Sequence, residues 1–434
     1  MHQIFKKTLL ISSLALAMSP AVYATNGLAP IGLGQVHKAM GGAAVGNPVN
    51  TMSMASNPAA ASFISDGFDM GGELFKPNRV VTNSAWVDAV QPGLGGTVYK
   101  GNAASAFFIP EGGYKKDVGN MSAGLIAYGN GGMNSSYKPK SPVFVTGAPS
   151  PNHIAPFNAG TSSTTGVDLK QVFISPTVSK KLNDKHSVGL SVNLIAQAFH
   201  ATGIQAFAGD PRVVASDPKK LQAFQDPGTS TSTGIGATVG WMGQLSDTVT
   251  MGASYRFKTK MSKFKKYIGL FPGGSMDVPA AATIGMAVKV SPATTIAADI
   301  QQIYYSKVAA IGNSSHSTKS FGDSDGAGFG WDDQTVYKIG VKHQLNPKLA
   351  LMGGLNHGKS PLGPEETRFN ALTPAVVEDH LSLGFEYKLD NSSSLSGSYI
   401  RTFSNTVKGD PTKGQPFDLS MDQHALGIAY SKQF

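Results

Sequence analysis

The sequence predicts an all-β protein, a transmembrane antiparallel β-barrel of about 14 strands, and three observations support this fold class. Segments that alternate apolar with small or polar residues follow one another from residue 66 onward. Short turns alternate with long connections between these segments, as in bacterial outer-membrane barrels. The last segment, 421–434, carries an apolar and aromatic face and ends on Phe434, which is typical of the last strand of such a barrel.

Composition excludes several other classes. The chain has 434 residues with 51 glycines and no cysteine, and its mean hydropathy is −0.08. Beyond the first residues, no apolar run reaches the roughly 20 residues that a spanning helix needs. A membrane protein of this kind must satisfy its backbone groups in a closed sheet. The lack of cysteine excludes a disulfide framework and a thiolate metal site.

The N-terminal part of the chain differs from the rest. Residues 1–24 are expected to be a cleaved signal peptide, since Lys6 and Lys7 precede an apolar stretch and small residues stand before a cleavage position. Residues 25–64 are rich in Gly, Ala, Asn and Met and lack alternation. This segment cannot form a core alone, so we expect it to be a compact segment packed inside something larger.

The alternation predicts individual strands, with boundaries uncertain by several residues. The predicted strands are 67–79, 104–116, 119–129, 170–182, 185–201, 232–245, 248–261, 277–290, 293–307, 333–345, 348–358, 378–390, 393–405 and 421–434. Turn-forming residues such as Asn346-Pro347 close the short connections. The short turns lie at one end of the barrel and seven long connections lie at the other. Because short turns are periplasmic in such barrels, the first strand is expected to begin and the last strand to end on the periplasmic side.

Two of the long connections have unusual side chains. The stretch 130–169 carries much apolar surface for an extracellular loop, including Val143, Phe144, Ile154 and Phe157. We expect it, together with 202–231, to capture an apolar ligand.

The net charge of the chain is +9. Much of the basic charge lies in predicted loops, especially in a group of five lysines: Lys258, Lys260, Lys263, Lys265 and Lys266. Contact with lipopolysaccharide phosphates and a merely solvated loop are equally compatible with them, whereas nucleic acid is not an expected partner of an exported chain.

Motifs of catalysis and metal binding are weak. Ser324 lies in a G-x-S-x-G match, but a nucleophile elbow needs a preceding strand and a following helix, and here the match stands in a glycine-rich loop. Asp323 and Asp325 lack the full calcium-loop pattern. Asp379-His380 is a possible dyad, although His380 is more simply a hydrogen-bonded rim residue. We therefore expect no enzyme activity, no cofactor and no metal.

Several short motifs, taken together, resemble the FadL/TodX-type family of outer-membrane transporters of long-chain fatty acids and aromatic hydrocarbons. The resemblance extends from residue 25 to 434, and its most specific pieces are Asn57-Pro58-Ala59, Gly269-Leu270-Phe271, Gly328-Phe329-Gly330-Trp331, Phe369-Asn370, Val377-Glu378-Asp379-His380 and the last strand. These pieces are specific for the family and not for a ligand.

The resemblance implies a 14-stranded barrel, formed by 65–434, that is plugged by a small N-terminal hatch, 25–64. It also implies a ligand path that leaves sideways through a gap in the barrel wall. It implies that Asn57, Pro58 and Ala59 face this gap and that the third predicted strand carries a kink. Gly124, Gly129, Gly131 and Gly132 are the residues suited to such a kink.

The expected function is passive outer-membrane transport of hydrophobic small molecules, with long-chain fatty acids and hydrocarbons both open as ligands. The main alternative is a general diffusion porin for polar solutes. An outer-membrane hydrolase and an adhesin or phage receptor are further alternatives. The expected partners are the ligand, outer-membrane lipid and lipopolysaccharide. A monomer is expected, because a closed barrel has no free sheet edges.

Overall fold

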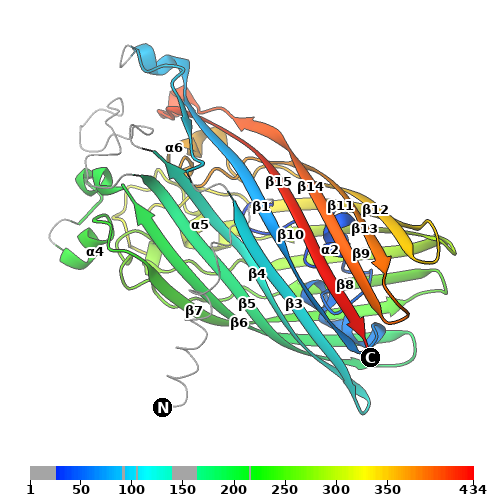
Figure 1. The fold of residues 1–434 in the computed structure, drawn as a ribbon. Coiled ribbons are helices and arrows are strands. Elements are labelled where there is room, and N and C mark those ends of the chain that lie inside the picture. Colours follow the sequence, from blue (N-terminus) through cyan, green and yellow to red (C-terminus); the bar gives the residue numbers. More distant parts are fainter. Residues whose placement is uncertain (1–25, 90–92, 104–105, 139–163, 215–216) are drawn as a thin grey trace, which may run out of the picture.

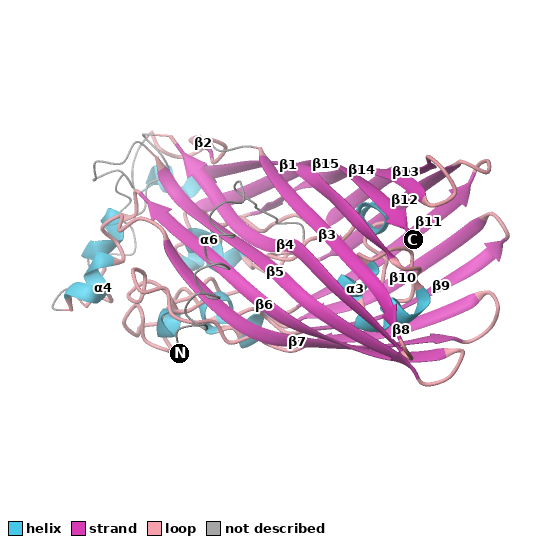
Figure 2. Cartoon of the chain, turned by 60° about the horizontal axis from the view of Figure 1, so that its bottom comes forward, coloured by secondary structure: helices cyan, strands magenta, loops and turns pink. Residues whose placement is uncertain are grey.

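The long strands of the protein form one closed antiparallel sheet (Figures 1 and 2). This is a computed structural model, and it describes residues 26–89, 93–103, 106–138, 164–214 and 217–434. The sheet closes because β1 (Gly67–Asn83) pairs with β15 (Phe417–Gln433) along its whole length. The result is a barrel of 14 strands plus one short additional strand, β2 (Val98–Lys100), which confirms the predicted fold class.

Each predicted strand corresponds to one barrel strand. The remaining strands are β3 (Phe107–Val118), β4 (Met121–Tyr137), β5 (Thr165–Lys181), β6 (His186–Thr202), β7 (Ser230–Gln244), β8 (Val249–Arg256), β9 (Ala281–Ser291), β10 (Thr294–Ile303), β11 (Gln334–Gln344), β12 (Leu349–Gly358), β13 (Asp379–Lys388) and β14 (Ser393–Val407). The strand ends at the long connections differ most from the prediction: β4 is longer than expected, whereas β8 and β10 are shorter, and β2 was not predicted at all.

The alternation of the sequence separates the two faces of the wall. On β15, Leu426 and Ile428 are 63% and 56% exposed and form part of an apolar outer belt. The intervening small residues face the lumen, as Gly427 does against Gln35. This is the arrangement that a strand needs when lipid lies on one side and a filled lumen on the other. Among the described residues, no helix has the length and apolarity to cross a membrane.

Residues 26–64, which we call the hatch segment, lie inside the barrel near the end that holds the C-terminus (Figures 1 and 2). Their regular parts are α2 (Gln35–Ala39), α3 (Ser53–Ser56) and η1 (Pro58–Phe63). Glycines permit the close fit between this segment and the wall. A Cβ added at Gly240 of β7 would lie 2.0 Å from Asn57 Oδ1, and one at Gly252 of β8 would lie 1.9 Å from the Val45 carbonyl oxygen.

The long connections gather at the opposite end of the barrel. They contain short helices, namely η2 (Ala85–Ala89), η3 (Gln205–Gly209), α4 (Pro218–Gln222), η4 (Pro272–Gly274), η5 (Tyr305–Lys307), α5 (Ala309–Gly312), η6 (Pro364–Glu366), α6 (Thr367–Asn370) and η7 (Pro411–Lys413). The largest buried apolar cluster of the described residues lies among these connections and the adjoining strand ends. The loops therefore form a packed apolar layer above the hatch segment.

Candidate functional site

An apolar pocket lies between the long connections. Seven phenylalanines contribute to its lining: Phe199, Phe207, Phe224, Phe271, Phe321, Phe329 and Phe369. Phe199 lies on β6 and the other six come from four different connections. Several of the rings contact one another directly. The rings of Phe321 and Phe369 stack at 5.9 Å, and the guanidinium of Arg212 lies 4.8 Å from the centroid of Phe321. The pocket thus offers an aromatic, nearly uncharged environment to a small apolar molecule.

Two motifs of the sequence fix the floor of this loop layer. The indole N–H of Trp331 donates to Asn370 Oδ1 at 2.7 Å, and Asn370 Nδ2 donates to the Phe329 carbonyl oxygen at 2.7 Å. Trp331 and Asn370 are fully buried. The segments 328–331 and 369–370, which are far apart in sequence, therefore bind each other and hold Phe329 and Phe369 at the pocket.

Tyr305 of η5 connects the loop layer to the hatch segment. Its hydroxyl accepts hydrogen bonds from the N–H groups of Leu28 at 2.9 Å and Ala29 at 3.2 Å, and it donates to the Asn26 carbonyl oxygen at 2.5 Å. Burial raises the pKa of this hydroxyl, so it remains protonated and able to donate. Its ring meets Trp331 edge to face at 5.3 Å. The start of the hatch segment is thereby fixed to the pocket floor.

The wall is interrupted beside this point. Pairing between β3 and β4 ends at Glu111 and Tyr128, although β4 continues to Tyr137 and β3 begins at Phe107. On its other side, β4 shifts its register with β5 between Gly129 and Gly131, which leaves Asn130 as an extra residue. A bulge bends its strand and breaks the local ladder. The barrel therefore has an unpaired stretch between residues 107–110 of β3 and 129–135 of β4.

The hatch segment touches the wall at this interruption. Gly131 has a φ of +154°, and a Cβ on it would lie 2.0 Å from the Leu28 carbonyl oxygen. Gly132 follows in the strand and pairs with Lys170. Gly124 lies in the regular part of β4, where a Cβ would meet Met54 Sδ at 2.5 Å. Of the four glycines suggested for a kink, Gly129 and Gly131 thus flank the bulge, whereas Gly124 provides space for the hatch segment.

A small cavity below the loop layer adjoins the interruption. Leu28, Gly131 and Leu169 line it together with Asn130 and Arg256. Asn130 and Arg256 also line a more polar cavity in the lumen, to which Asp299 and Lys338 contribute. Arg256 makes only long hydrogen bonds, 3.3 Å to Asn130 Oδ1 and 3.5 Å to the Pro279 carbonyl oxygen. Its Nε is buried with no hydrogen-bond partner among the described residues, so this guanidinium retains donor capacity.

The Asn57-Pro58-Ala59 motif lies on a different part of the wall. Asn57 Nδ2 donates at 2.9 Å both to the Val45 carbonyl oxygen and to the Trp241 carbonyl oxygen of β7, while its Oδ1 accepts from the N–H of Ala59. The Ala59 carbonyl oxygen accepts from Ser187 of β6 at 2.9 Å. The motif is thus placed against β6 and β7, and the hatch residue at the interrupted wall is Leu28.

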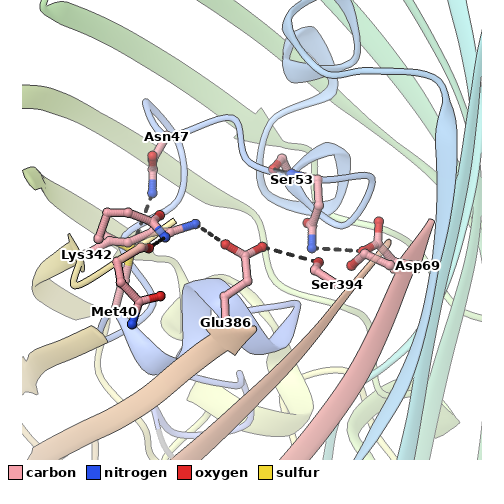
Figure 3. Close-up of polar contacts among 11 residues, drawn as sticks. Met40, Asn47, Ser53, Asp69, Lys342, Glu386 and Ser394 are labelled. Carbon is pink, nitrogen blue, oxygen red and sulfur yellow. Dashed lines mark hydrogen bonds and ion pairs between the residues drawn. The ribbon is translucent and has the colours of Figure 1, made fainter. Parts of the chain in front are cut away.

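Buried charges attach the rest of the hatch segment to the lumen wall. Lys38 of α2 lies 3.1 Å from Glu73 on β1 and 3.5 Å from Glu111 on β3. Asp299 of β10 accepts from the N–H groups of Ala44 and Val45, at 2.8 and 3.1 Å. Asp69 of β1 accepts from Asn50 Nδ2 at 3.0 Å and the Thr51 N–H at 2.8 Å (Figure 3). The segment is therefore held at several separate points.

Charged pairs also occur within the lumen wall itself. Glu386 of β13 pairs with Lys342 of β11 and accepts a hydrogen bond from Ser394 of β14 at 3.5 Å (Figure 3).

Inside the hatch segment, the two ring nitrogens of His37 approach the carbonyl oxygens of Leu33 and Asn47, at 3.1 and 3.0 Å. Burial lowers the pKa of His37. His37 therefore ties parts of the hatch segment to each other.

The predicted capture residues are only partly open to comparison. Val143, Phe144, Ile154 and Phe157 lie outside the described residues. The other predicted capture connection, 202–231, contributes Phe207 and Phe224 to the pocket. The prediction omitted the contributions of 262–276, 308–332 and 359–377. The signal for them was present in the aromatic motifs at 269–271, 328–331 and 369–370.

The weak catalytic motifs do not assemble. Residues 322–326 form consecutive turns with no flanking strand or helix. Asp323 is paired with Lys220 at 2.7 Å. Asp379 faces outward and pairs with His357 at 2.7 Å, whereas His380 is buried on the lumen side of the same strand. The described residues contain no group of three or more acidic or His side chains that could hold a metal ion.

Comparison with known proteins agrees with this geometry. The family model described as outer membrane protein transport protein (OMPP1/FadL/TodX) matches residues 10–434. The toluene transporter TodX of Pseudomonas putida is similar in structure, with a TM-score of 0.66, 18% identity and coverage of 93% of this chain and 99% of that chain. The Ralstonia pickettii toluene transporter TbuX gives 0.62 at 17% identity, with 93% and 99% covered.

A FadL homologue of Pseudomonas aeruginosa is also similar, with a TM-score of 0.60, 14% identity and coverage of 96% of this chain and all of that chain. No curated protein sequence matches the chain. At these identities the solved structures support the fold, while the family model covers nearly the whole sequence. The chain belongs to the OMPP1/FadL/TodX family of outer membrane protein transport proteins.

Proposed function

We propose that the protein carries hydrophobic small molecules passively from the cell surface into the outer membrane, with capture among the long connections and release through the wall beside β4. The observation that supports release at this place is the end of β3–β4 pairing next to Gly131 and Leu28. An apolar ligand has no thermodynamic reason to leave an apolar pocket for water, since each buried methylene stabilises binding by roughly 0.8 kcal/mol. Exit into lipid removes this barrier.

The order of cavities along β5 supports a continuous route. Val167 lines the aromatic pocket, and Leu169 and Gln171, which follow on the same face, line the cavity at the interrupted wall. The ligand would move by the length of a few residues from one to the other. Displacement of Leu28 from Gly131 would then place the ligand at the unpaired stretch of the wall.

The charge at the lower end of this route favours an acidic amphiphile over a neutral hydrocarbon. Arg256 adjoins both lower cavities, and its weakly bonded guanidinium is suited to a carboxylate, which accepts bidentate hydrogen bonds. An apolar tail in the aromatic pocket and a carboxylate at Arg256 describe a fatty acid. A general porin would instead need an open lumen, and here the hatch segment occupies the described lumen at several charged anchors.

Removal of the bulge tests lateral release. Deletion of Asn130 would make Gly129 and Gly131 consecutive and restore a regular β4–β5 ladder. A matched control exists on β14, where the register with β15 shifts between Thr402 and Asn405, so deletion of Ser404 removes a bulge distant from the route. Uptake of a radiolabelled fatty acid by cells expressing each variant is the readout, with folding checked by heat-modifiable electrophoretic mobility.

We expect the Asn130 deletion to abolish most uptake while binding of the ligand to the purified protein is retained. The Ser404 deletion should leave uptake close to the unaltered level. Undiminished uptake by a folded Asn130 deletion would show that the ligand leaves by another route. Loss of binding as well as uptake would mean that the bulge shapes the binding cavity and would refute a specific role in release.

A further inference from the structure

The outer surface above β7 and β8 carries a group of lysines that the transport route does not use. Within 258–266 the exposed residues include five lysines, Lys258, Lys260, Lys263, Lys265 and Lys266, which we call the lysine face. They are interspersed with Thr259, Met261, Phe264 and Tyr267, all at most 3% exposed. Because the intervening side chains are anchored inside, the lysines are held on the outside of a fixed segment.

Lys260 fixes the direction of the lysine face relative to the barrel wall. Met261 forms an antiparallel bridge with Gly234, so Lys260 lies opposite Ile235, and side chains directly opposite in such a pair project to the same face. Ile235 is 72% exposed and belongs to the outer apolar belt. Lys260 therefore projects outward beside a lipid-facing residue.

Aromatic residues fix the height of the lysine face relative to the membrane. Tyr255 and Phe257 are exposed on β8 and just beyond it, and their rings meet edge to face at 4.8 Å. Outer-membrane barrels carry such aromatic residues at the boundary between hydrocarbon and headgroups. The lysines begin at the next residue, which places them at the level of the lipid headgroups of the outer leaflet.

The charge of the lysine face is largely uncompensated. The sequence contains no Asp or Glu between Arg256 and Asp277. The ammonium group of Lys258 lies 3.5 Å from the Asp277 carboxylate. The ammonium groups of Lys260, Lys263 and Lys265 have no hydrogen-bond or ion-pair partner in the part of the chain that the structure describes. By contrast, Arg401 on the outer face of β14 is paired with Asp422 at 2.7 Å.

We propose that the lysine face binds the phosphate groups of lipopolysaccharide in the outer leaflet. Lysine is a point-charge ligand for phosphate, and its long stem can lie along apolar surface while the ammonium group reaches the headgroup. A surface that presents unpaired lysines directly above an aromatic boundary complements a phosphorylated glycolipid whose acyl chains lie along the belt. This interaction is independent of the transported ligand.

The test uses the full-length exported protein in detergent and three ligands: lipopolysaccharide, the same lipopolysaccharide after dephosphorylation, and inorganic phosphate. The variant K260A/K263A/K265A removes the unpaired lysines. K116A/K185A/K348A removes three exposed lysines at the short-turn end and serves as the matched control. K260R/K263R/K265R keeps the charge, and heat-modifiable mobility verifies that each barrel is folded.

We expect the alanine variant of the lysine face to weaken the lipopolysaccharide Kd by about 100-fold, roughly fivefold for each lysine. The control and the arginine variant should bind like the unaltered protein, and dephosphorylated lipopolysaccharide should bind weakly to all. An unchanged Kd in the alanine variant, an equal loss in the control, or equal affinity for the dephosphorylated lipid would overturn the proposal. Lysine-dependent binding of inorganic phosphate without binding of lipopolysaccharide would also overturn it.

Discussion

A single hydroxyl group, that of Tyr305, holds the beginning of the hatch segment through three hydrogen bonds. Tyr305→Phe removes these bonds and leaves the ring contact with Trp331 in place. Loss of hydrogen bonds to buried backbone groups costs about 1–3 kcal/mol. We therefore expect amide hydrogen exchange in a peptide spanning 26–34 to accelerate by about 10- to 100-fold, measured by mass spectrometry.

Tyr430→Phe is the control for this substitution. Its hydroxyl donates at 3.3 Å to Ser393 within the barrel wall, so its removal should leave exchange in the hatch segment unchanged. If Tyr305→Phe does not alter exchange at residues 28 and 29, the N-terminal end is held by contacts other than Tyr305.

Arg256 is the residue expected to distinguish acids from neutral ligands. Arg256→Met keeps the length of the side chain and removes its charge. We expect the affinity for a long-chain fatty acid to fall by about 10- to 100-fold, because a hydrogen bond to a charged group contributes about 1.5–3 kcal/mol. The affinity for the alcohol of the same chain length should change little. Calorimetric titration of both ligands in the same micelles measures the difference.

Arg401→Met, on the lipid-facing side of β14, is the control for Arg256→Met. It should leave both affinities unchanged. An equal loss for the acid and the alcohol would indicate that Arg256 supports the shape of the cavity and does not recognise a carboxylate.

At the scale of elements, the junction between η1 and β7 depends on Asn57. Asn57→Asp keeps the shape of the side chain but removes both N–H groups that donate to the Val45 and Trp241 carbonyl oxygens. Unpaired buried carbonyls cost about 1–3 kcal/mol, so we expect the hatch segment to detach more often. The readout is the frequency of brief conductance events in a planar bilayer. Asn391→Asp, in an exposed turn, is the control and should leave that frequency unchanged. If Asn57→Asp does not raise the frequency of conductance events, the hydrogen bonds of Asn57 do not hold the hatch segment in place.

The strands were predictable where lipid on one face and the lumen on the other impose a period of two. Accordingly β12 and β14 were predicted to within about two residues at each end. The extracellular ends were less predictable. Beyond Leu74 the outward residues of β1 are Lys76 and Asn78, so the polarity contrast between the faces disappears although the strand continues to Asn83. β2 has three residues, too few to show a period at all.

The site was predictable in composition more than in position. The aromatic motifs at 328–331 and 369–370 were visible in the sequence, but their mutual hydrogen bonds join different connections and depend on tertiary packing. The position of Asn57 also depends on tertiary packing, because no local sequence pattern specifies its neighbours on β6 and β7. Leu28 and Tyr305 carried no sequence signal, because a leucine near the start of a segment and a tyrosine in a loop are common.

At the scale of the whole molecule, the hatch segment is expected to close a barrel that is stable without it. In the described residues the segment forms no strand pair with the wall, so its removal leaves every ladder hydrogen bond in place. Deletion of 25–64 should therefore give a folded barrel with a large steady ion conductance, whereas the intact protein should conduct little. Bilayer recording measures both, and a closed deletion variant would refute the assignment of residues 25–64 as a hatch.

The seam between β1 and β15 is bridged from inside the barrel. The two strands pair over the full 17 residues of β1, and Lys38 of the hatch segment binds Glu73 on β1 while Gln35 accepts from Ser398 on β14 at 2.6 Å. The segment thus has partners on both sides of the seam. Opening of the barrel at this seam would therefore break these two contacts as well as the β1–β15 ladder.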